Sequence, residues 1–105
     1  MKKEIYIYID DTRQPLIPDA LWVKSYDEAI AALTTIPYTP SLVIDFDHDL
    51  GEEKSGYDCA KFVVSYCQEH DLDIPSYDIQ SSNCVGKDNI RSLLNNWHTV
   101  FKELN

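Results

Sequence analysis

The chain has 105 residues, of which 44% are hydrophobic, and this is enough for one domain with one modest core. Its formal net charge of -9 argues against nonspecific binding to nucleic acid or to an anionic membrane, since both require cationic side chains. No run of about 18 apolar residues could span a bilayer, and the N-terminus lacks a secretory signal, so we expect a cytoplasmic protein.

The predicted elements begin with a strand over residues 5–9, in which isoleucines alternate with tyrosines. Both faces of this strand are apolar, which is typical of a strand in a covered parallel sheet. It ends at Asp10 and Asp11. Two prolines make residues 12–20 a loop, which leads into a short strand over residues 21–23. Ser25 and Glu28 then stand at capping-box spacing, and they predict a helix that ends before Pro37.

The second half of the chain repeats this alternation. Residues 42–44 form a buried apolar strand, and an acidic loop follows it. Ser55 and Asp58 are spaced as a second capping box, before a helix that runs to about His70. A shorter strand covers residues 76–81. A last helix, opened by Gly86 and Lys87, has apolar side chains at helical spacing: Ile90, Leu93, Leu94, Trp97, Phe101 and Leu104.

The cysteines point to no structural crosslink. Cys59, Cys67 and Cys84 are odd in number and lack CxxC spacing, so they fit neither a disulfide framework nor a zinc site. We interpret them as reduced and mostly buried thiols. With strands and helices in alternation, residues 1–105 are predicted to form a single α/β domain, a three-layer sandwich around a parallel sheet of about four strands.

Aspartates follow two of the predicted strands. Asp10 and Asp11 close the first strand, and Asp45, Asp47 and Asp49 close the third. If these strands are neighbours, both groups lie at the carboxyl edge of the sheet, where ligands of open α/β folds bind. Clustered carboxylates repel one another, and a hard divalent cation, Mg²⁺ or Mn²⁺, relieves that repulsion. The alternative is that these are ordinary solvated loops at strand ends.

This arrangement resembles the receiver domain of two-component signalling, which has a flavodoxin-like fold. There, two acids after the first strand and one aspartate after the third bind magnesium and accept a phosphoryl group. The resemblance assigns the metal to Asp10, Asp11 and Asp47, with Asp47 as phosphoacceptor. It places Asp49 where receivers contribute a backbone carbonyl to the metal, and Ser81 where they carry a hydroxyl. No helix fits after Asp11, and no fifth strand with the receiver lysine is found.

A closer resemblance covers nearly the whole chain. The segments DDTRQP, LVIDFDHDLG, SGYDCAKF and SSNCVGKDNI, in this order, are similar to the cyclic-phosphate processing receiver domains. That family implies a flavodoxin-like fold, a metal-dependent acidic site and a role with cyclic nucleotides or cyclic phosphates in prokaryotic and phage conflict systems. Gln80 stands where the family pattern has histidine. Because an amide does not titrate, this departure favours binding over hydrolysis.

Several other residues are candidates for the site, and each has an alternative role. Arg13 could contact a ligand phosphate or pair with Asp11. His48 could donate a proton to a leaving oxygen or orient a carboxylate. The polar groups of Ser81, Ser82 and Asn83 could hydrogen-bond a ligand phosphate, or they could cap a turn. Lys87 could replace the receiver lysine at the start of the last helix, or be solvated there.

The function that we expect is metal-dependent binding, with or without hydrolysis, of a cyclic nucleotide or another small phosphate ligand. If the chain is a phosphoesterase, Asp47 and His48 carry the catalysis. Two alternatives are a sponge for a nucleotide messenger and a noncatalytic receiver-like module that binds a protein partner or a second copy. A phosphoacceptor of the usual signalling type is the third choice.

Overall fold

The computed structural model describes residues 4–105. The elements in chain order are β1 (Ile5–Ile9), β2 (Leu21–Val23), α1 (Tyr26–Thr35), β3 (Leu42–Asp47), α2 (Gly56–His70), β4 (Ser76–Gln80) and α3 (Cys84–Leu104). Each predicted strand and helix is present. Three boundaries differ from the predicted ones. Strand β3 extends to Asp47, β4 ends at Gln80 rather than Ser81, and α3 begins two residues before Gly86.

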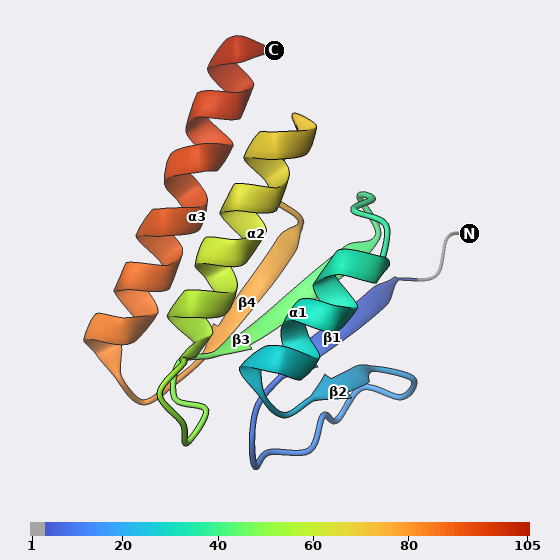
Figure 1. Ribbon diagram of the computed structural model, residues 1–105, viewed down its shortest axis with the longest axis vertical. Coiled ribbons are helices and arrows are strands. Elements are labelled where there is room, and N and C mark those ends of the chain that lie inside the picture. The colour runs from blue at the N-terminus through green and yellow to red at the C-terminus, as the bar shows by residue number, and fades with distance from the viewer. Residues whose placement is uncertain (1–3) are drawn as a thin grey trace.

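The four strands form one parallel sheet in the order β2-β1-β3-β4 (Figure 1). Strands β1 and β3 are therefore neighbours, and their register pairs Ile9 with Phe46. Asp10 and Asp47 each follow directly after that pair. The carboxyl ends of parallel strands meet at one edge of a sheet, so this register places both acidic segments at that edge. The sheet and its connections confirm the receiver-like α/β fold.

Each of the three helices starts at a polar cap. The Ser25 side chain accepts a hydrogen bond from the Glu28 N–H at the start of α1. Ser55 and Asp58 form a reciprocal capping box at the start of α2, as their spacing predicts. The side chain of Asn83 accepts from the Gly86 N–H at the start of α3. Within residues 4–105, no helix combines the length and apolar character that crossing a membrane requires.

The core lies between the sheet and a single layer of helices. Leu42, Ile44 and Phe46 on β3 are at most 1% exposed, and they belong to one cluster with Ile7 and Ile9 of β1 and with buried side chains of the helices. Helix α2 contacts both α1 and α3, so the three helices lie side by side across the same face of the sheet (Figure 1).

The layering differs from the expected three-layer sandwich. The chain crosses from β2 to β3 and from β3 to β4 in the same direction along the sheet, so right-handed crossovers place α1 and α2 on one face. The β1–β2 crossover runs the opposite way and would place a helix on the other face, but residues 10–20 form a loop. Among the described residues, the protein is therefore a two-layer structure whose shortest extent is 21 Å.

Candidate metal and phosphate site

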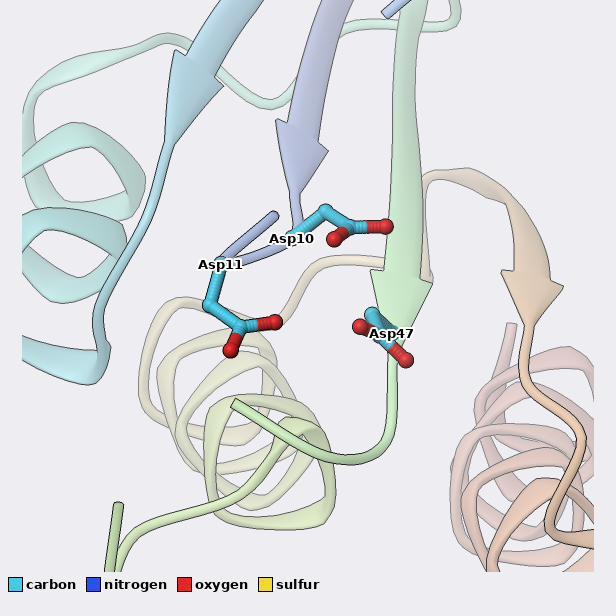
Figure 2. A group of neighbouring side chains, drawn as sticks. All are labelled: Asp10, Asp11 and Asp47. Carbon is cyan, nitrogen blue, oxygen red and sulfur yellow. The ribbon is translucent and has the colours of Figure 1, made fainter. Parts of the chain in front are cut away.

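Three carboxylates meet at the carboxyl edge of the sheet. Asp10, Asp11 and Asp47 each offer one oxygen, and these oxygens all lie within 4.8 Å of one another. Figure 2 shows Asp10 and Asp11 after the end of β1, extending toward Asp47 at the end of β3. Oxygen donors of this charge and spacing suit a hard divalent cation such as Mg²⁺, which binds through carboxylates and leaves further positions for phosphate or water.

Asp10 is held in place by its own loop. Its side chain is only 3% exposed, and Oδ1 accepts hydrogen bonds from the backbone N–H groups of Thr12 at 3.1 Å and Arg13 at 2.8 Å. Its backbone carbonyl accepts a 2.7 Å hydrogen bond from the indole Nε1 of Trp22 on β2. These bonds leave Oδ2 free of a hydrogen-bond partner among the described residues. The orientation of the Asp10 carboxylate is thus set before any ligand arrives.

Two carboxylates at the carboxyl edge of the sheet have raised pKa values. Burial and the nearby Asp10 carboxylate raise the pKa of Asp47 from 3.8 to about 6. Burial, Asp78 and Asp10 raise the pKa of Asp45 from 3.8 to about 7. The positive charge of Arg13 opposes both shifts. A bound cation would favour the ionised carboxylates and lower both pKa values.

Two of the three glycines of the chain allow the loop after β3 to reach this site. A Cβ atom on Gly56, at the start of α2, would lie 1.8 Å from the carbonyl oxygen of Asp47. The N–H of Gly56 donates a 2.8 Å hydrogen bond to the carbonyl of His48, which ties the helix start to the end of β3. Gly51 has φ of +68° and lies against the Asp11 carboxylate.

The side chain of Asp49 stabilises the loop after β3. Its Oδ1 accepts a 2.9 Å hydrogen bond from the Gly51 N–H, and Asp49 lies outside the close group of three carboxylates. Its backbone N–H hydrogen-bonds Asp47, which offsets part of the rise in the pKa of Asp47. The side chain of Asp49 therefore shapes the loop, and its expected role as a metal ligand stays a prediction.

A polar depression of about 370 Å³ is lined by two of the three carboxylates, those of Asp11 and Asp47, while Asp10 is buried beside it. Residues from three separate segments line it: Asp11, Thr12, Arg13, Asp47, Asp49, Gln80, Ser81, Ser82 and Asn83. The chain thus brings together most of the residues predicted for metal and phosphate binding. Among the described residues, no ion pair joins Arg13 to Asp11, and the Arg13 side chain is exposed. Its guanidinium hydrogen-bonds the Tyr8 hydroxyl, and its exposed part can also contact a ligand.

The polar groups after β4 differ in how much of their capacity remains free. The amide oxygen of Asn83 caps α3, and Ser81 Oγ accepts a hydrogen bond from the Asn83 N–H. Ser82 is exposed, and its side chain makes no hydrogen bond within residues 4–105. Gln80 Nε2 donates to Asp78 at 3.2 Å. Ser82 and the Ser81 hydroxyl proton are thus the groups best able to bind a ligand oxygen.

His48 and Lys87 do not line the depression. The His48 ring packs against Gly86 of α3, where a Cβ atom would come within 2.5 Å of it. Gly86 thus allows α3 to approach the loop after β3. Lys87 is half-buried in the first turn of α3 and makes no ion pair among the described residues. The predicted roles of these two residues in the site therefore stay predictions.

Sequence reasoning did not single out Thr12 or Trp22. Thr12 follows the acidic pair directly, and an aspartate followed by polar residues and a proline is a signal for a turn that the Asp10 side chain stabilises. Trp22 carried no such signal, because its hydrogen bond to Asp10 depends on the pairing of β1 with β2. The sequence indicates Gly86 only as part of a helix start, and its contact with His48 depends on the folded chain.

A family model, described as the cyclic-phosphate processing receiver domain, matches residues 5–96. The chain belongs to this family. The match spans every strand and the whole acidic site, and it confirms the resemblance carried by the four sequence motifs. No curated protein and no solved structure matches the chain. Membership in the cyclic-phosphate processing receiver domains thus rests on the family model and agrees with the observed fold.

Proposed function

We propose that this cyclic-phosphate processing receiver domain binds a divalent cation, Mg²⁺ or Mn²⁺, through Asp10, Asp11 and Asp47. The observation that carries the proposal is the approach of three carboxylate oxygens within 4.8 Å at the carboxyl edge of a parallel sheet. Asp47 and its neighbour Asp45 have raised pKa values, so the site favours a ligand that brings positive charge.

The ligand of the metal-loaded site is proposed to be a small cyclic or phosphorylated nucleotide. The depression beside the carboxylates is polar and is lined by one exposed guanidinium, that of Arg13, and by the hydroxyls of Ser81 and Ser82. A phosphate could accept hydrogen bonds from these groups while its other oxygens face the cation. A net charge of -9 disfavours binding of this anion without the metal.

Binding without turnover is the mode that the residues favour. In hydrolysis a bound metal would polarise the phosphoryl group, and a protein side chain would move a proton. Gln80 lines the depression but does not titrate, and the His48 ring packs against Gly86 outside it. The proposed role is therefore capture of a nucleotide messenger in a prokaryotic or phage conflict system, and hydrolysis is the competing outcome.

The phosphoacceptor function is less well supported. It requires a cationic side chain near Asp47 to stabilise the transferred phosphoryl group. In the receiver domains that the chain resembles, a lysine has this role. Lys87 is the residue expected to replace that lysine, and it does not line the depression. Incubation with acetyl phosphate and Mg²⁺ should therefore leave Asp47 unmodified in an intact-mass measurement.

Tryptophan fluorescence offers a direct test of the proposal. Trp22 donates to the Asp10 carbonyl, so its emission should respond to a cation at the site. Trp97→Phe removes the other tryptophan of the chain, which lies near Leu72. We expect Mg²⁺ and Mn²⁺ to shift the Trp22 signal with a dissociation constant below about 1 mM. Asp47→Asn should abolish that shift, while Asp88→Asn on α3 should retain it.

A panel of cyclic mono-, di- and trinucleotides then tests the ligand. Each is titrated into the protein with Mg²⁺ by calorimetry, and phosphorus NMR follows its integrity. Binding that requires the metal and leaves the nucleotide intact is the expected result. Metal-dependent cleavage lost in Asp47→Asn would replace capture by hydrolysis. Equal binding with Mg²⁺ and with EDTA would contradict a metal-mediated ligand site.

A further inference from the structure

One face of the sheet is covered by no helix within residues 4–105. Register and alternation place Asp47 and Gln80 at the carboxyl edge of this face and six other side chains larger than serine on the rest of it: Tyr6, Tyr8, Trp22, Val43, Asp45 and Asp78. We call this set the open face. None of its residues belongs to the core cluster or packs against it. Parallel sheets are normally covered on both faces, so an uncovered face of this kind is unusual.

The open face combines aromatic and acidic side chains. Tyr8 is 9% exposed, and burial and the Asp45 and Asp10 charges raise the pKa of its hydroxyl. Tyr6 lies on the same strand, and Val43 is its partner on β3. Tyr6 and Val43 are half-buried and offer apolar surface beside the buried Tyr8, where a covering element would exclude water.

Two carboxylates lie side by side on this face. Asp45 on β3 pairs with Asp78 on β4 in the sheet register. Like charges directly opposite each other destabilise a strand pair. Within residues 4–105, no lysine or arginine forms an ion pair with either of them. The apolar centre is thus bordered by negative charge, which the positive charge of Arg13 offsets only in part at Asp45.

We infer that the open face docks a basic amphipathic helix of a partner protein. A helix is the element that covers parallel sheets, and its period can present apolar residues to Tyr6, Tyr8 and Val43. Lysines or arginines along one flank would then reach Asp45 and Asp78. A second copy of the chain is the poorer occupant, because it would bring like charges together and carries a net charge of -9.

The test uses synthetic helical peptides of about 18 residues as probes. One has leucines on one side and lysines on the flanks, one replaces the lysines with glutamates, and one scrambles the first sequence so that the leucines share no face. Each is titrated into the ¹⁵N-labelled protein and followed by amide chemical shifts. We expect only the first peptide to bind, with shifts centred on β1, β3 and β4. Equal binding of the scrambled peptide would overturn the inference.

Matched charge reversals separate docking from general attraction between a cationic peptide and an acidic protein. Asp78→Lys changes the charge of the open face, and Glu69→Lys makes the same change on exposed α2. Asp78→Lys should weaken the amphipathic peptide about tenfold, and Glu69→Lys less than about twofold. Equal losses, shifts that avoid the open face, or binding by none of the peptides would each contradict the inference.

Self-association is read out in the same spectra. A second copy as occupant would produce open-face shifts that depend on protein concentration without any peptide, and this result would also overturn the assignment to a basic helix. Because Asp78 is exposed, both charge reversals should fold. Their Trp22 response to Mg²⁺, described above, shows whether each variant retains the carboxyl edge of the sheet. Docking and metal binding can therefore fail independently.

Discussion

The two faces of strand β3 have different roles, since one packs in the core and the other presents carboxylates at the site. Leu42, Ile44 and Phe46 point toward the helices and are at most 1% exposed. Their neighbours Val43, Asp45 and Asp47 alternate with them on the other face and are only half-buried. Because side chains of a strand alternate, six consecutive residues both anchor the core and present charge at the site. Adjacent residues of β3 should therefore respond to substitution in opposite ways.

The largest effect is expected at the buried face. Phe46→Ala removes a fully buried ring from the core and should lower the free energy of unfolding by about 3–4 kcal/mol in urea denaturation. The fraction that remains folded should bind Mg²⁺ with unchanged affinity, since Phe46 points away from the carboxylates. A large loss of affinity in the folded fraction would show that the two faces of β3 are not separate.

The neighbouring residue should give the reverse pattern. Asp47→Asn removes a negative charge from the group of three carboxylates and should weaken Mg²⁺ binding about 100-fold in calorimetry. The same substitution should stabilise the metal-free protein at neutral pH, because burial and Asp10 disfavour the ionised Asp47. Destabilisation of the metal-free protein would mean that Asp47 has a structural role as well.

Gly56→Ala should affect both properties together. The added Cβ would meet the Asp47 carbonyl oxygen at 1.8 Å, and backbone atoms cannot turn aside as a side chain can. We expect a loss of about 2 kcal/mol in the free energy of unfolding and weaker Mg²⁺ binding, because the end of β3 must move. A variant with wild-type stability and affinity would show that the loop adapts freely.

Asp45 provides a test by pH. Its pKa is raised to about 7, so the folded metal-free protein holds the proton more tightly than the unfolded chain. Stability therefore falls as pH rises from about 4 to about 7. Asp45→Asn should raise the free energy of unfolding by about 1 kcal/mol at pH 7.5 and change it little at pH 4. A loss of stability at both pH values would contradict the cause of the shift.

The smallest effect is expected at the third glycine. Gly86→Ala places a Cβ atom within 2.5 Å of the His48 ring. Because the His48 Cγ atom also lies 2.5 Å away, the half-buried side chain must rotate about its Cα–Cβ bond, and the helix propensity of alanine offsets part of that cost. Stability should therefore change by about 1 kcal/mol. Mg²⁺ affinity should change less than about twofold, because His48 lies outside the group of three carboxylates. A strong effect on affinity would place His48 in the site after all.

Much of the fold could be predicted because its signals are local. Two serines at capping spacing, Ser25 and Ser55, and a proline after the first helix set element boundaries by interactions within a few residues. The acidic edge was also predictable, because Asp10, Asp11 and Asp47 close strands and parallel strands end at a common edge. Its composition followed once β1 and β3 were assumed to be neighbours.

Other features needed the assembled chain. The expected role of His48 rested on its neighbours in sequence, whereas its ring direction depends on how closely α3 approaches through Gly86. The apolar tyrosines of β1 predicted a sheet covered on both faces. A tyrosine on an uncovered sheet face and a tyrosine beneath a helix stand in the same alternating sequence pattern. The two cases differ here because the connection between β1 and β2 is a loop and not a helix.

By itself, the sequence determined the alternation of strands and helices and the acidic ends of two strands, because periodicity, caps and turns act over a few residues. Only the tertiary structure decided that oxygens of Asp10, Asp11 and Asp47 come within 4.8 Å of one another, that His48 and Lys87 do not line the depression, and that no helix within residues 4–105 covers one face of the sheet. These outcomes depend on register and crossover direction, which join segments far apart in the chain.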